Sequence, residues 1–260
     1  MTILIFFICL GASIAGSICG IGGGVIIKPL LDMLGIMSIS AISFLSGLTV
    51  MSMAAISVFR QRKLRLVDLR TGSLLAVGAA VGGAAGNAVF QAVKAYAGHD
   101  RLVGSLQAAV LAAVTLLTLI YSAFLREKLP AYRVHAAPAC ALLGGVMGLM
   151  SAFLGIGGGP INLAILYFAF SMDTKKAAAN SLYIILFSQI SSLIASLCKG
   201  TVPDFPLHCL PVMTAAGVIG GMLGTRINRS LSASAAARLF DVLLLAVIGI
   251  CICNAVRFAR

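Results

Sequence analysis

Two glycine runs with the same five letters, GIGGG, are the segments whose composition and spacing point most directly to chemistry: Gly20–Gly24 and Gly155–Gly159. Three successive glycines cost backbone entropy in a continuous helix, so each run favours a helix break. If helices restart at Val25 and Pro160, their first-turn amides present the positive end of a helix dipole, and proline suits a first turn. The two runs therefore predict one central binding site for a small oxyanion.

The alternative for these glycines is that they only let helices cross closely. We expect close packing, rather than a site, for two other glycine groups whose spacing is that of a helix face. These are Gly82, Gly83 and Gly86, and Gly220, Gly221 and Gly224.

Lys28 is the only Lys or Arg embedded in the first apolar region, and a cation there is a functional candidate by default. It would add a full charge to the anion site. Two other roles remain open for it: an ion pair with Asp32 four residues later, or a long side chain that reaches the membrane interface.

Neutral donors can bind an oxyanion without adding net charge, although each is also typical of an interhelical hydrogen bond. The predicted substrate site combines such donors with the glycine amides and Lys28. Its members are Gly22, Gly23, Gly24, Lys28, Ser46, Thr49, Gly157, Gly158, Gly159, Asn162, Asn180, Ser181 and Gln189.

Enzyme chemistry has little support in this sequence. There is no HExxH or GxSxG motif, no His within an apolar segment, and the GIGGG runs fail the GxGxxG dinucleotide pattern. The seven cysteines show no metal-ligand spacing, and His99, His135 and His208 lie at loop edges. We therefore expect no catalytic residue, no metal and no cofactor.

The composition requires a membrane. The chain has 260 residues, 60% of them hydrophobic and 10% charged, against about 25% charged in soluble domains. At about 20 residues per crossing, it can hold about eight spanning helices. The net charge of +12 is explained by Lys and Arg in cytoplasmic loops, so no nucleic-acid partner is expected. The first 16 residues contain no Lys or Arg, so we expect a retained helix rather than a signal peptide.

Eight apolar runs organise the chain as two copies of one unit. A shift of 135 residues superposes the two GIGGG runs, and shifts of 138 and 137 align later parts of the unit. Such internal repeats are typical of secondary transporters. We predict an all-helical membrane protein with a first repeat over 1–130 and a second over 131–260, together one membrane domain. The runs are 3–34, 36–58, 72–93, 102–125, 136–172, 177–198, 207–225 and 239–256.

The orientation of the copies can be predicted from loop charges, since Lys and Arg favour the cytoplasmic side. If each GIGGG region is a re-entrant or broken hairpin, the copies are inverted, with 13 basic residues inside and five outside. Eight plain crossings with parallel copies give 11 inside and seven outside. The count favours inverted repeats, each opening with a broken or re-entrant helix at GIGGG. In that arrangement the loops near residues 60–70, 126–133, 175–176 and 226–238 face the cytoplasm.

The doubled GIGGG motif, with VIIK and Pro29 after the first copy and Pro160 after the second, resembles the TauE/SafE sulfite-exporter family over essentially the whole chain. The family's GxGGG-x4-Pro pattern maps onto Gly20, Gly22, Gly23, Gly24 and Pro29. The second copy departs from it, with Ala164 where the proline would fall.

The resemblance implies a multi-pass protein of the bacterial inner membrane that exports sulfite, sulfoacetate or a related sulfur-containing anion. A passive anion channel is the alternative, because facing helix ends could also form a filter. The expected partners are a small anionic solute and membrane lipids. Whether the chain forms a homo-oligomer stays open at the sequence level.

Overall fold

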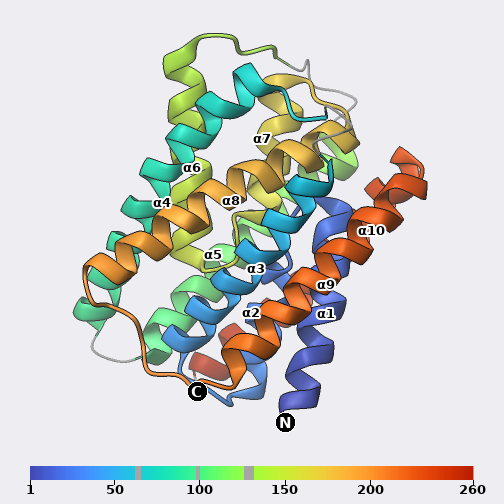
Figure 1. Ribbon diagram of the computed structural model, residues 1–260. Helices are drawn as coiled ribbons and strands as arrows, with labels where there is room; N and C mark the ends of the chain where they lie inside the picture. The colour runs from blue at the N-terminus through green and yellow to red at the C-terminus, as the bar shows by residue number, and fades with distance from the viewer. Residues whose placement is uncertain (62–65, 98–99, 126–131, 260) are drawn as a thin grey trace.

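The computed structural model is helical throughout the residues it describes, which are 1–61, 66–97, 100–125 and 132–259 (Figure 1). Eight of its helices are long and apolar enough to cross a membrane, as the sequence predicts. The first half contains α1 (Thr2–Cys19), α2 (Gly24–Leu34), α3 (Ile39–Gln61), α4 (Leu69–Ala97), α5 (Asp100–Ile120) and the short π-helix η2 (Tyr121–Leu125). The second contains α6 (Ala137–Leu154), α7 (Gly159–Phe170), α8 (Thr174–Cys198), α9 (Cys209–Ser230) and α10 (Ala233–Ala259).

Both GIGGG runs break their helices, as predicted. Gly20 ends α1 and Gly155 ends α6 in the left-handed conformation, with φ of 78° and 65°. Each then donates its amide hydrogen to a carbonyl of the helix it ends, which satisfies part of the helix terminus. The helices restart at Gly24 and Gly159, one residue before the predicted positions.

Each broken segment folds back as a helical hairpin. In the first, Ile27 and Leu31 of α2 share a core cluster with Ile5 and Cys9 near the start of α1, so α2 returns along α1. In the second, the amide of Tyr132 donates to the carbonyl of Phe168 (2.8 Å), and Val134 donates to Ala169 (2.9 Å). The start of α6 and the end of α7 therefore lie together, and each GIGGG run is the tip of a hairpin.

Helices of one repeat pack on helices of the other in matched pairs. α1 packs along α9 as α6 packs along α4, α3 contacts α9 as α8 contacts α4, and α5 contacts α10. The start of α3 lies beside the end of α8, since residues from both line one pocket. Inverted copies would have these directions. Their orientation in a membrane remains a prediction.

The glycine groups in α4 and α9 serve close packing, as expected. A Cβ atom added at Gly82 would lie 2.0 Å from the carbonyl oxygen of Gly145 on α6. One added at Gly220 would lie 2.5 Å from Cβ of Ser13 on α1. These glycines bring the helix backbones together and leave no room for a side chain.

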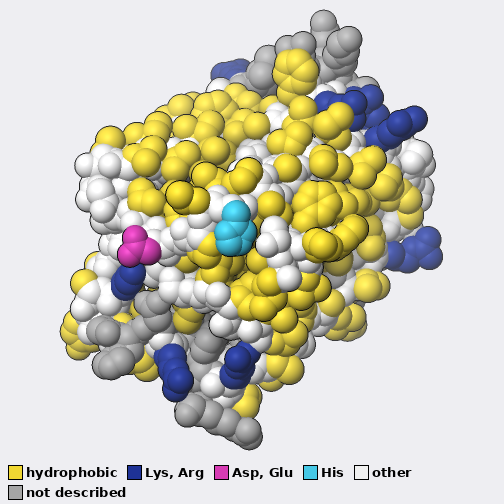
Figure 2. Space-filling model, turned by 60° about the horizontal axis from the view of Figure 1, so that its bottom comes forward, with side chains coloured by type: hydrophobic (Ala, Val, Ile, Leu, Met, Phe, Trp, Pro, Cys, Tyr) yellow, Lys and Arg dark blue, Asp and Glu magenta, His cyan; other side chains and the backbone are white. Residues whose placement is uncertain are grey.

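Apolar side chains cover most of the surface in Figure 2, and the few charged ones lie mainly toward its edges. Large exposed hydrophobic residues such as Val77, Leu117 and Leu245 are 59% to 66% exposed. A surface of this kind suits contact with lipid. Of the loop charges used to predict orientation, Arg62, Lys63, Arg65, Arg126, Lys128 and Arg260 lie outside the described residues, as does His99.

Candidate functional site

The tips of the two hairpins meet in the middle of the molecule. A Cβ atom added at Gly24 would lie 2.6 Å from the carbonyl oxygen of Ile156, and one added at Gly159 would lie 2.9 Å from that of Ile21. Gly22 and Gly157 both lie against Val50 of α3 and Ile185 of α8. The glycines thus allow the tips to approach closely, and Val50 and Ile185 are fully buried beside them.

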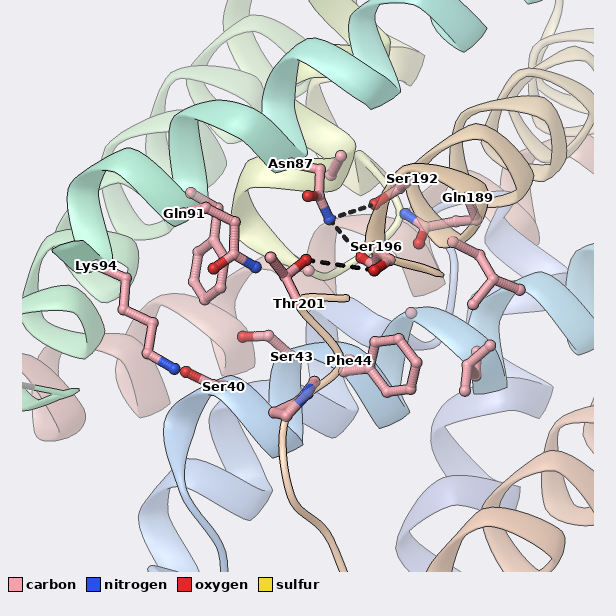
Figure 3. A pocket seen from close by; sticks show the side chains of 17 residues that line it. Ser40, Ser43, Phe44, Asn87, Gln91, Lys94, Gln189, Ser192, Ser196 and Thr201 are labelled. Atoms are coloured by element: carbon pink, nitrogen blue, oxygen red, sulfur yellow. Dashed lines mark hydrogen bonds between the residues drawn. The ribbon is translucent and has the colours of Figure 1, made fainter. Parts of the chain in front are cut away.

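A pocket opens between α3, α4 and α8 and reaches inward to Gly155, at the tip of the second hairpin (Figure 3). Its volume is about 50 Å³, which is room for about four water molecules or one small oxyanion. Thr201 and Pro203, from the segment between α8 and α9, lie at the pocket as well.

Three helices each contribute a stripe of polar or small residues to this pocket. Positions spaced by three and four residues face the same side of a helix, so each stripe is continuous. The stripes are Ser40, Ser43 and Gly47 on α3; Asn87, Gln91 and Lys94 on α4; and Gln189, Ser192 and Ser196 on α8.

Lys94 is the one charged residue among the described residues that line the pocket, and none of them is acidic. Figure 3 shows its side chain extending from α4 toward Ser40 on α3. Asn87 donates to Ser196 (2.7 Å) and to Ser192 (3.3 Å), which fixes its amide group. A pocket with a cation, hydroxyls and amide groups but no carboxylate has the chemistry of an anion site.

Polar groups continue inward from the pocket to the second glycine run. Gln189, on the pocket wall, donates from Nε2 to Oγ of Ser151 (3.0 Å). Ser151 and Asn162 both lie next to Gly158. Asn162 is fully buried, and both polar atoms of its side chain lack a hydrogen-bond partner. Buried amide groups without a partner are costly, so this position suits a polar ligand or water.

Of the predicted site residues outside the glycine runs, Gln189 is the one that lines this pocket. Ser46 and Ser181 are fully buried with unpartnered hydroxyls. Thr49 instead donates to the carbonyl of Leu45 on its own helix (2.8 Å), and Asn180 donates to the carbonyls of Leu66 (3.2 Å) and Lys176 (2.8 Å).

Lys28 lies away from the pocket. Its Nζ atom is 2.6 Å from Oδ2 of Asp32, with both side chains about 95% buried. This is the ion pair that the sequence offered as one alternative for Lys28.

The residues that the sequence analysis did not select are the rest of the three stripes, above all Asn87, Gln91 and Lys94. Lys94 was assigned only to an outer loop. The signal that could have found them is their shared helical spacing inside apolar segments, because a polar stripe on a membrane helix must face protein or a cavity.

The sequence profile of the family described as Sulfite exporter TauE/SafE matches residues 5–250. The chain belongs to this family. It is 22% identical over 268 residues to "Probable membrane transporter protein YunE" of Bacillus subtilis (strain 168), covering 91% of this chain and 92% of that protein. No solved structure matches the chain significantly.

A second relative is matched over a short region. This TauE/SafE protein is 28% identical over 96 residues to "Probable membrane transporter protein MamO" of Paramagnetospirillum magneticum (strain ATCC 700264 / AMB-1). The match covers 35% of this chain and 15% of that protein. Together with the eight apolar helices, the family and its relatives make the chain a multi-pass membrane transporter.

Proposed function

We propose that this transporter carries a small anion, of the class of sulfite, sulfoacetate or a related sulfur oxyanion or organosulfonate, and that it exports this anion across a bacterial inner membrane. The observation that carries the proposal is the pocket's chemistry: Lys94 with hydroxyl and amide donors, and no acidic residue among its described lining. The family description adds sulfite as the first substrate to test.

The anion enters beside Lys94 and moves inward along the α3, α4 and α8 stripes. It then reaches the amides of Gly157–Gly159, Asn162 and the facing Gly22–Gly24. These are backbone and neutral side-chain donors, which bind an oxyanion without trapping it in a strong ion pair. Because Lys28 is engaged by Asp32, Lys94 and the helix ends supply the positive potential in this scheme.

Alternating access explains the remaining geometry better than a passive channel. The pocket is open at the end where α3 begins and α8 ends. Beyond the meeting hairpin tips, the related helices α1, α3 and α9 are joined by buried hydrogen bonds between Ser17 and Ser57 (2.9 Å) and between Ser17 and Thr225 (3.2 Å). One end open and the other held closed is the arrangement that a transporter alternates between.

The test is a binding screen of sulfite, sulfate, thiosulfate, sulfoacetate and taurine on purified protein, with Lys94→Met as the test variant. Lys199→Met is the matched control, because Lys199 is exposed at the same end of α8 and does not line the pocket. We expect Lys94→Met to weaken binding about fivefold to tenfold, the scale of one partly exposed charge-assisted hydrogen bond. Equal affinity in wild type and Lys94→Met would remove the pocket from the binding site.

A further inference from the structure

A second polar cluster lies between α2, α5 and α10, at a place separate from the anion pocket. It consists of Lys28, Asp32, Gln107 and Asn254, and we call it the α2 cluster. Lys28 and Asp32 form its ion pair, and Asp32 is the buried acid among the described residues. The two cavities share no lining residue.

Three oxygen atoms of the α2 cluster have no hydrogen-bond partner: Oδ1 of Asp32, Oε1 of Gln107 and Oδ1 of Asn254. The amide nitrogens of Gln107 and Asn254 donate to the carbonyls of Phe153 (2.6 Å) and Pro29 (2.8 Å), which fixes both amide groups. Gln107 and Asn254 are only 2% and 1% exposed. The cluster therefore leaves three acceptors buried without a donor.

All four side chains line one small cavity of about 10 Å³, which has room for about one water molecule. A metal cation fits poorly there, because the ammonium group of Lys28 already lies 2.6 Å from Asp32 and would repel it. The ligand that this arrangement can accept is a proton, delivered through a water to the free oxygen of Asp32.

The fold does not need these polar groups. Under the repeat shifts of 135 and 137 residues, the α2 cluster corresponds to Leu163, Tyr167, Leu244 and Leu117. Leu163, Tyr167 and Leu244 share one apolar core cluster, so the second copy builds the same helix contact without an ion pair. A buried ion pair is weak evidence for stability, since desolvation offsets its attraction. The asymmetry between the copies therefore points to a function for the α2 cluster.

We propose that the α2 cluster is a proton-binding site that couples proton movement to anion transport, an inference that rests on the proposed function. A proton from solvent adds to Asp32, the ion pair loses its negative partner, and the cluster changes from net zero to +1. That charge offsets one charge of the anion during the conformational change. Gly24, at the hairpin tip, lies only one helical turn from Lys28, so a change in the ion pair bears directly on the tip.

The groups that face Asp32 leave few other candidates for this proton. Besides Lys28, Cys251 of α10 is the titratable residue among the described lining. Arg257 lies one turn further along α10 and donates to the carbonyl of Met33. The elements α5 and α6 contribute Gln107, Ala108, Leu111 and Leu154, which do not titrate.

Infrared difference spectroscopy on purified protein tests proton binding without any substrate. Acidification of the wild type should produce a carboxylic acid band that is missing from Asp32→Asn. Asp241→Asn is the matched control, because Asp241 is a half-buried acid on α10 that accepts from Ser122 (2.8 Å) and lies outside the cluster. The double variant Lys28→Met with Asp32→Asn removes both charges and serves if the single variant does not fold. A band that persists in either variant overturns the proposal.

Coupling is tested in proteoliposomes with sulfite. The readout is the ratio of sulfite flux driven by a pH gradient to sulfite exchange without a gradient. We expect the gradient to stimulate the wild type and Asp241→Asn, and to have no effect on Asp32→Asn. Stimulation that persists in Asp32→Asn overturns the coupling role. Absence of sulfite flux in the wild type would contradict sulfite as the substrate, and the infrared band would then decide on the proton site alone.

Discussion

Lys28 and Asp32 stabilise each other as buried charges, so the loss of one partner should cost more than the loss of both. We expect Lys28→Met to lower the free energy of unfolding by about 3 to 5 kcal/mol, the usual scale for a stranded buried charge. Adding Asp32→Asn should recover most of that loss. Thermal unfolding of the single and double variants in the same detergent checks this, and equal stability of the two would show that the pair is not coupled.

The same variant also tests whether Lys28 binds the anion. Because Lys28 lies outside the pocket, Lys28→Met should leave sulfite affinity nearly unchanged. Had Lys28 contacted the anion, its removal would weaken binding by about 1 to 3 kcal/mol, which is about five- to 150-fold. Titration of purified Lys28→Met with sulfite distinguishes these results.

Gly23 is the position where a single methyl group tests the hairpin tip. Its φ of −62° suits any residue, but an added Cβ would lie 3.0 Å from Cα of Ser13 on α1. Overpacking of this kind costs about 1 to 3 kcal/mol, so Gly23→Ala should reduce sulfite transport about tenfold, and Gly23→Leu should abolish it. Gly249→Ala is the control, because nothing lies within 4 Å of its added Cβ. Normal transport in Gly23→Leu would move the site elsewhere.

At the scale of elements, sequence patterns predicted the helices well, because length, hydropathy and glycine breaks are local properties. The restarts at Gly24 and Gly159 fell within one residue of the prediction. The predicted run 239–256 was too short, since α10 begins at Ala233, in a segment of alanines and serines whose hydropathy is modest. Such residues form helices readily but do not mark a membrane span.

The candidate pocket was harder to predict, because it depends on which helix faces meet. Asn87 and Lys94 are isolated polar residues along α4, and only the contact of α4 with α8 brings them to Ser192 and Ser196. Gln189 was selected because it lies deep in an apolar segment, whereas Lys94 lies near a helix end and resembles an ordinary loop charge. Neutral polar residues such as Thr49 were selected on the same grounds as Gln189, yet Thr49 bonds its own helix.

For the whole molecule, the orientation of the two repeats is the first quantity to measure. Val202→Cys and Ser232→Cys, each in a variant with Cys198→Ser and Cys253→Ser, place one accessible thiol in each of two loops, since the other five cysteines are buried. Inverted repeats predict that a membrane-impermeant maleimide labels Val202→Cys from outside and Ser232→Cys from the cytoplasm. Labelling of both from one side would contradict the inverted arrangement.

The hydrogen bonds that join α1, α3 and α9 give the molecule a closed end opposite the pocket, and we expect them to set the balance between open and closed forms. Ser17 and Ser57 are fully buried, and Ser17 also contacts Thr225. Each such bond contributes about 1 kcal/mol net, so the double variant Ser17→Ala with Ser57→Ala should shift the equilibrium by about 2 kcal/mol, or about 30-fold.

Two reporters read this shift from opposite ends without any substrate. Gln61→Cys is 5% exposed at the closed end, and Gln91→Cys lines the open pocket. In the double variant, labelling of Gln61→Cys should rise while labelling of Gln91→Cys falls, because one end opens as the other closes. Ser230→Ala is the control, since Ser230 is exposed and bonds only the carbonyl of Ile227 on its own helix. A rise at Gln61→Cys with no fall at Gln91→Cys would mean that both ends open together, which is the behaviour of a channel and would contradict alternating access.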